Sequence, residues 1–177
     1  MQQVLTVANV LTTVRLVLAF PIIYFLAAGV RSAAVLVLFG LAALTDLLDG
    51  YFARKRNEET SLGRILDPVA DKILVVGTLL ALTVSGSIPL AWILILGGKE
   101  LALILGGAVL LGKARDVIKA RFLGKAATAI LLCGVLLILV SLEHVGRTAI
   151  GVGILVSLAA GVDYLLVALR WRSETNV

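Results

Sequence analysis

The chain has 177 residues, of which 60% are hydrophobic and only 15% are charged, whereas average globular chains are about 45–50% apolar and about 25% charged. This composition excludes an ordinary soluble domain and indicates that the protein folds in a lipid bilayer. A spanning helix takes roughly 20 residues, so there is room for about six spans with their loops and for no separate soluble domain. The formal net charge is +5, but in a membrane protein the placement of the charges matters more than their sum. No nucleic-acid partner is expected.

Six apolar runs follow one another along the chain, separated by short polar or glycine-containing breaks. Transmembrane strands are disfavoured, because they would alternate apolar and polar residues over about ten positions whereas these runs are long and continuous. The predicted fold class is all-α, an integral membrane bundle of six transmembrane helices that forms one domain over residues 1–177. The predicted spans cover residues 10–28, 33–52, 65–84, 88–111, 122–142 and 149–169.

Basic residues fall mainly on one side of this predicted bundle. With six spans the two termini share a side, and the loops after the second and fourth spans face that side too. The other side holds only Arg31, in the loop after the first span, and Arg147, in the loop after the fifth. His144 lies in that second loop with Glu143 and Arg147, and it is expected to be a solvated loop residue. By the positive-inside rule, the termini and the basic loops are cytoplasmic, which predicts a multi-pass protein of the cell's inner membrane. The basic residues on the terminal side are Arg54, Lys55, Arg56, Arg64, Lys113, Arg115, Lys119, Arg121, Arg170 and Arg172.

Four aspartates lie where the second predicted span ends and the third begins. A carboxylate at membrane depth is costly unless it is paired, solvated or metal-bound, so these acids are candidates for function. Asp46 and Asp49 are three residues apart and Asp67 and Asp71 are four apart, which places each pair on one helix face. Because a short hydrophilic segment joins the two helices, we expect them to be antiparallel neighbours with both pairs at similar depth.

Carboxylates that lie so close together cannot all stay ionised unless cations lie between them. The ligand set contains only oxygen, which favours Mg²⁺ or Mn²⁺ over Ca²⁺ and argues against zinc or copper. Four carboxylates on two helices could hold one or two such ions. The simpler interpretation of any single aspartate is a helix-end acid paired with Arg54, Arg64 or Lys72.

Together with their neighbours, the aspartates form a pattern that resembles the complete signature of the CDP-alcohol phosphatidyltransferase family. The matching residues, between positions 46 and 71, are Asp46, Asp49, Gly50, Ala53, Arg54, Gly63, Asp67 and Asp71. This resemblance implies a membrane enzyme that transfers a phosphatidyl group from CDP-diacylglycerol to an alcohol and releases CMP. It also implies that the four aspartates hold two divalent ions, Mg²⁺ or Mn²⁺, that Asp71 is the general base, and that the protein is a homodimer among membrane lipids.

The same resemblance assigns further positions to the CDP-lipid. In the N-terminal segment these are Asn9 and Thr12, within a short stretch that is similar to the family's N-terminal nucleotide contact. Small residues of the signature allow a ligand or a neighbouring backbone to approach closely, and Arg54 can add a charge-assisted contact to phosphate. The positions predicted around the signature are Gly50, Ala53, Arg54, Thr60 and Gly63.

Basic residues after the fourth span are predicted to bind an anionic acceptor. We assign Arg115, Arg121 and Lys125 to the acceptor phosphate, with anchoring to anionic lipid of the inner leaflet as the alternative for the loop. Residues 123–128 and 66–72 are similar to the phosphatidylglycerophosphate synthase branch of the family, which uses glycerol 3-phosphate. Residues 41–50 and 67–74 are also similar to cardiolipin synthases, which use phosphatidylglycerol, and an inositol phosphate acceptor ranks third.

A divalent-cation transporter is the alternative outside the enzymes. Carboxylates that bind ions in transporters usually lie near the bilayer midplane within repeated halves, whereas these four lie toward one face in consecutive helices. Three further charged residues within predicted spans, Lys99, Glu100 and Asp163, receive no role from the sequence.

Overall fold

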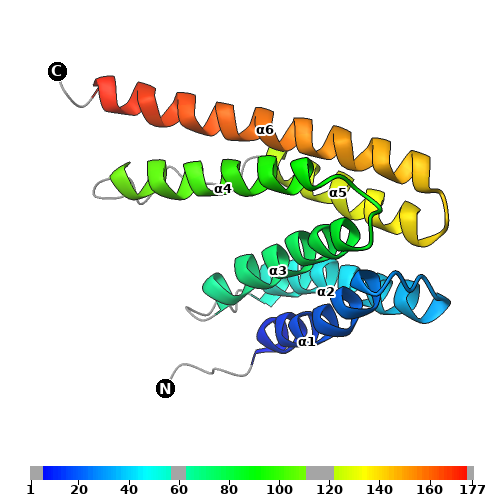
Figure 1. The fold of residues 1–177 in the computed structure, drawn as a ribbon. Helices are drawn as coiled ribbons and strands as arrows, with labels where there is room; N and C mark the ends of the chain where they lie inside the picture. Colours follow the sequence, from blue (N-terminus) through cyan, green and yellow to red (C-terminus); the bar gives the residue numbers. More distant parts are fainter. Residues whose placement is uncertain (1–5, 57–62, 111–121, 175–177) are drawn as a thin grey trace.

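The computed structural model is all-helical over the residues it describes, with six α-helices and no strand among them (Figure 1). It describes the backbone of residues 6–56, 63–110 and 122–174, and the side chains of residues 6, 9–45, 66, 69–103 and 123–162. The predicted fold class is confirmed as an all-helical arrangement. The helices are α1 (Val7–Ala27), α2 (Ala33–Arg56), α3 (Gly63–Val84), α4 (Leu90–Leu110), α5 (Phe122–Leu139) and α6 (Glu143–Glu174).

Helix limits follow the apolar runs closely, and the largest difference is at the start of α6. The sequence predicted a loop up to residue 148, but α6 begins at Glu143, so the expectation that His144 and Arg147 lie in a loop was wrong. An acid in the first turn is favoured there by the helix dipole. Arg147 Nη2 also lies 3.5 Å from Glu143 Oε2, one turn earlier, which supports the added turn.

The helices form two groups of three. In one group α1 packs against both α2 and α3; in the other α6 packs against α5 and α4. The groups meet more sparingly, where α3 faces α4 and α5 and where α2 faces α5. In Figure 1 the start of α1, the end of α2, the start of α3 and the end of α6 all lie at the same end of the molecule. These four helix ends are the ones next to the predicted cytoplasmic termini and the predicted cytoplasmic loop after the second span.

Close backbone contact holds α5 against α6. A Cβ atom on Gly146 would lie 2.7 Å from the carbonyl oxygen of Gly134 and 2.6 Å from the Ile138 side chain. Real Cβ atoms do not approach backbone so closely, so both glycines are needed for this helix separation. Small residues at such positions let two helix backbones meet, which is a common source of stability in membrane bundles.

We predict that Gly146→Ala lowers the melting temperature of the detergent-solubilised protein. The added methyl group meets backbone that cannot move without separating α5 from α6, and overpacking of this kind costs about 1–3 kcal/mol. Gly40→Ala in α2 is the matched control, because nothing lies within 4 Å of its added Cβ. The packing argument is wrong if the two variants melt at the same temperature, which a thermal unfolding series measures directly.

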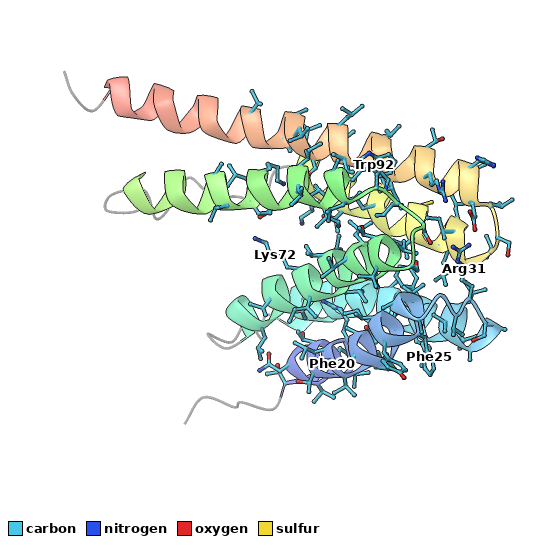
Figure 2. All side chains as sticks on the ribbon, viewed as in Figure 1. Phe20, Phe25, Arg31, Lys72 and Trp92 are labelled. Atoms are coloured by element: carbon cyan, nitrogen blue, oxygen red, sulfur yellow. The ribbon has the colours of Figure 1, made fainter. Side chains whose placement is uncertain are left out.

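Polar contacts join two loops and the start of α6 at the opposite end of the bundle. Arg31, between α1 and α2, forms an ion pair with Glu143 at the start of α6 and donates a hydrogen bond to Ser87 Oγ at 2.7 Å. Ser87 lies between α3 and α4, and Figure 2 shows Arg31 at this end of the molecule. These contacts link the two helix groups on the side away from the aspartates.

Two of the described helical stretches are long and apolar enough to cross a membrane, Asn9–Ala27 and Glu143–Val162. Two others are apolar but shorter, Ala33–Thr45 and Leu123–Leu139. The prediction of six spans is therefore confirmed as six helices, but not as six membrane crossings. The outward face of α1 is strongly apolar, since Val17, Phe20 and Tyr24 are all exposed, and a contiguous apolar surface of this kind is typical of contact with lipid or another protein.

Candidate active site

Asp71 lies two turns into α3 and is the one aspartate of the signature whose side chain the structure describes. Its side chain is 43% exposed, although the neighbouring Ala70 and Leu74 are buried in the core. The periodicity of α3 explains this difference, because residues 70 and 74 lie on the face that packs inward while residue 71 is turned about 100° away. Asp71 therefore lies at the border between the packed core and an open cavity.

A buried arginine from another helix forms an ion pair with Asp71. Arg15 is in the middle of α1, its side chain is only 1% exposed, and its Nη1 donates a hydrogen bond to Asp71 Oδ1. The sequence did not predict this partner, and the alternatives considered for the aspartates were Arg54, Arg64 and Lys72. Lys72, which follows Asp71 in the chain, has its Nζ 2.8 Å from Glu100 Oε2.

Two of the predicted nucleotide-binding residues lie on the same face of α1 as Arg15. Asn9 and Thr12 are buried, as Arg15 is, and a spacing of three residues places all three along one side of the helix. The Thr6 side chain caps the start of α1 by accepting a hydrogen bond from the Asn9 amide at 3.3 Å. This first part of α1 thus carries a buried polar face toward the end of the bundle where α2 ends and α3 begins.

On the other side of Asp71 is a cavity of about 480 Å³. Its walls come from both helix groups, with α3 on one side and α4, α5 and α6 on the other. Most of the lining is apolar, from residues such as Val76, Leu79 and Leu96. The polar lining residues are Asp71, Lys72, Lys99, Glu100, Thr128 and Ser157.

A chain of polar contacts crosses this cavity from α3 to α6. Glu100 in α4 is its centre: Oε2 accepts from Lys72 of α3 and Oε1 from Lys99, both at 2.8 Å. Lys99 Nζ also donates to Ser157 Oγ of α6 at 2.8 Å. Figure 2 shows Lys72 extending from α3 toward α4. One carboxylate therefore holds two ammonium groups at the cavity wall, close to Asp71, which precedes Lys72 in the chain.

Several predicted site residues belong to helix ends whose side chains are not described. Asp46, Asp49, Gly50, Ala53 and Arg54 are in the last turns of α2, and Gly63 and Asp67 are in the first turns of α3. Thr60, Arg115 and Arg121 lie outside the described residues, as does the side chain of Asp163. Lys125 is in the first turn of α5 with an exposed side chain, and its neighbours Gly124 and Thr128 line the cavity. Its assignment to the acceptor stays a prediction.

A divalent metal ion fits the chemistry of the signature's donor set, which consists of carboxylates alone. Among the side chains that the structure describes, no three or more His, Cys, Asp or Glu residues come together as a metal site. Asp71 contributes one carboxylate at the cavity wall, and it already attracts a cation, the guanidinium of Arg15. The ligand set itself remains the prediction made from the spacing of the four aspartates.

Arg15 is the residue at this candidate site that the sequence did not predict. It had a signal, because a cation inside an apolar run is a functional candidate by the same rule that selected the aspartates. Its spacing of three residues from Thr12 was a second signal. Its partner depends on the packing of α1 on α3, which the sequence does not specify.

The chain belongs to the CDP-alcohol phosphatidyltransferase family, whose family model matches residues 5–162. Members of this family are typically membrane-bound and generally use divalent metal ions. The match covers the signature, Arg15, and the residues of the polar chain across the cavity.

Several curated relatives are similar over most of the chain. A probable phosphatidylglycerophosphate synthase of Mycobacterium tuberculosis is 33% identical over 95% of this chain and 84% of its own length. A CDP-diacylglycerol–glycerol-3-phosphate 3-phosphatidyltransferase of Aquifex aeolicus is 44% identical over 60% of this chain and 61% of its own length. A CMP-forming cardiolipin synthase of Streptomyces coelicolor is 35% identical over 78% of this chain and 67% of its own length.

Proposed function

We propose that this protein transfers the phosphatidyl group of CDP-diacylglycerol to glycerol 3-phosphate, releasing CMP and giving phosphatidylglycerophosphate. The observation that carries the proposal is Asp71, which ends the family signature and lies at the wall of a cavity lined by two lysine side chains. A carboxylate can accept the proton that the alcohol must lose, and neighbouring ammonium groups can hold an anionic phosphate. The names of the Aquifex and Mycobacterium relatives support the same acceptor.

The two substrates are proposed to reach Asp71 from opposite sides. The CDP-lipid occupies the side of α1 and α2, with contacts from Asn9, Thr12, Gly50, Ala53, Arg54, Thr60 and Gly63. The acceptor occupies the cavity between α3 and the second helix group, and Arg115, Arg121 and Lys125 guide its phosphate from the cytoplasmic side. The buried polar face of α1 and the position of the cavity on the other side of Asp71 support this division.

In the proposed reaction Asp71 accepts the proton of the acceptor hydroxyl. The hydroxyl oxygen forms a bond to the phosphorus of the phosphatidyl group, the bond from that phosphorus to the CMP oxygen breaks, and CMP leaves with the electron pair. Mg²⁺ or Mn²⁺, held by Asp46, Asp49, Asp67 and Asp71 when bound, supplies neutralisation of the pyrophosphate charge. Lys72 and Lys99 attract and orient the acceptor phosphate at the cavity wall.

We expect Lys99→Met to weaken glycerol 3-phosphate binding more than CDP-lipid binding. The variant removes an ammonium group that lines the cavity, and charge-assisted hydrogen bonds contribute about 1.5–3 kcal/mol, so the KM for the acceptor should rise roughly 10- to 100-fold. Ser157→Ala is the matched control, because it removes a partner of Lys99 and leaves the positive charge. Steady-state CMP release measures both, and equal KM values for the acceptor in Lys99→Met and the parent protein would contradict the role.

All six helices are proposed to cross the cell's inner membrane, with both termini and the active site on the cytoplasmic side. The distribution of basic residues, the family match and the exposed apolar face of α1 support this orientation. A single domain over residues 1–177, surrounded by membrane lipids and paired as a homodimer, completes the proposal. Reaction at the membrane surface suits a donor held in the bilayer and an acceptor dissolved in the cytoplasm.

Cardiolipin synthesis from phosphatidylglycerol is the second candidate, since the Streptomyces relative is named a CMP-forming cardiolipin synthase. Purified protein with CDP-diacylglycerol and Mg²⁺ is incubated separately with glycerol 3-phosphate, phosphatidylglycerol, inositol phosphate or serine, and CMP release is measured. Release only with glycerol 3-phosphate supports the first proposal, and release only with phosphatidylglycerol selects the second. Absence of CMP in every tube contradicts the enzyme assignment and leaves the transporter to be tested by cation flux in vesicles.

A further inference from the structure

Arg15 is a fully buried cation in the middle of the first helix. Its neighbours on the inward face of α1 are apolar, including Ala19, Ile22 and Leu26, none of which is more than 1% exposed. A buried arginine is tolerated only where a carboxylate or several acceptors compensate its charge. The burial of Arg15 therefore indicates that its guanidinium has a compensating partner at a fixed position in the fold.

The carboxylate of Asp71 is such a partner. Arg15 lies on α1 and Asp71 on α3, and these two helices are held in register farther along by the close approach of Ile23 to Gly77. The relative positions of Arg15 and Asp71 are thus fixed by helix packing. Because Asp71 also lines the cavity and is 43% exposed, the guanidinium approaches the carboxylate from the core while the acceptor cavity lies on its other side.

The lysines that line the cavity beside Asp71 have different partners. Lys72 and Lys99 both contact Glu100, and Lys99 is further held by Ser157. These two ammonium groups belong to the cavity wall, whereas Arg15 belongs to the core. A guanidinium is planar and always charged, so it can fix the orientation of a carboxylate in a way that an ammonium cannot. Loss of a group that orients a metal-binding or catalytic side chain commonly lowers metal affinity or activity.

We propose that Arg15 is a positioning residue for Asp71: it fixes the orientation of this carboxylate and supplies the positive charge that lets the aspartate-rich end of the bundle fold before metal binds. The catalytic part of this inference rests on the proposed function, whereas the part concerning metal and folding does not. Arg15 is 1% exposed and is not among the residues that line the cavity, so it is proposed to act through Asp71.

The catalytic part predicts a selective loss of turnover. Arg15→Lys keeps the charge but loses the planar fork, so kcat should fall about 10- to 100-fold, with KM for both substrates changed less than about threefold. Arg15→Met should lose more of kcat than Arg15→Lys does. If KM for the CDP-lipid rises while kcat is kept, Arg15 binds the nucleotide and the positioning role is wrong.

The folding part is tested by melting temperature in detergent, with EDTA and with Mg²⁺. In EDTA, Arg15→Met should have a lower melting temperature than the parent protein. Mg²⁺ should raise the melting temperature of the variant by more than it raises that of the parent, because the metal replaces the missing positive charge. Arg31→Met is the matched control, since Arg31 also pairs with a carboxylate, Glu143, but at the opposite end. The difference in melting temperature between Arg31→Met and the parent protein should be the same in EDTA and in Mg²⁺.

A loss in Arg15→Met that Mg²⁺ leaves unchanged would overturn the charge-compensation role. Should Arg15→Met fail to accumulate as folded protein, Arg15→Lys decides: it must keep the parent's melting temperature in EDTA and still lose kcat, and any other result contradicts the proposal. If the parent protein releases no CMP with any acceptor, the proposed function fails. The dependence of the melting temperatures on Mg²⁺ then still supports or overturns the folding part for Arg15.

Discussion

Asp71→Asn is expected to reduce CMP release by at least about 10²- to 10⁴-fold, the usual contribution of a positioned general base, while the protein stays folded. The amide cannot accept the proton of the acceptor hydroxyl. It does keep a carbonyl oxygen that can accept the hydrogen bond from the buried Arg15, so the packing of α1 on α3 should survive. CMP release from CDP-diacylglycerol and glycerol 3-phosphate measures the loss, and thermal unfolding in the same detergent measures the fold.

Glu143→Gln provides the matched control for this experiment. Glu143 is also a carboxylate paired with an arginine, Arg31, but it lies at the end of the bundle away from the aspartates. It should keep the rate of CMP release even if its melting temperature falls. Appreciable activity in Asp71→Asn would remove Asp71 as the base, and a collapse of its melting temperature would show that the amide fails to compensate Arg15.

Removal of divalent ions is expected to bring CMP release down to the background rate. The pyrophosphate of the CDP-lipid is strongly anionic, and carboxylates from α2 and α3 would repel it unless metal ions neutralise both. Added Mg²⁺ or Mn²⁺ should restore the rate after exhaustive treatment with chelator. Zn²⁺ should not, because a set of oxygen ligands without His or Cys is not the preferred environment of zinc.

Samples matched in ionic strength with NaCl control for general effects of salt. A binding curve for Mg²⁺, read from the rise in melting temperature, gives a second readout that does not depend on turnover. Full activity after exhaustive chelation would contradict the metal site, and with it the proposed roles of Asp46, Asp49 and Asp67. Restoration by any divalent ion with equal efficiency would contradict the preference for Mg²⁺ or Mn²⁺.

Much of this protein follows from its sequence alone. The number of helices and most of their limits could be predicted, because long continuous apolar runs are required for a helix in lipid and end where charges and turn residues begin. The family could be predicted because eight defined residues at fixed spacings lie within positions 46–71. The end of α3 at residue 84 and the start of α2 at residue 33 agree with the structure. The predicted start of the sixth helix differs from the structure, because the charged first turn of α6 resembles a loop in composition.

The tertiary structure decided which side chains meet across helices. The pairing of Arg15 with Asp71, the link from Lys72 through Glu100 to Lys99, and the contact of Gly134 with Gly146 each join different helices. Spacing along one helix defines its faces, but which faces oppose one another depends on how each helix is rotated and tilted against its neighbours. The sequence determined which charges exist within the apolar runs, and only the packing of α1 on α3 and of α3 near α4 determined their partners.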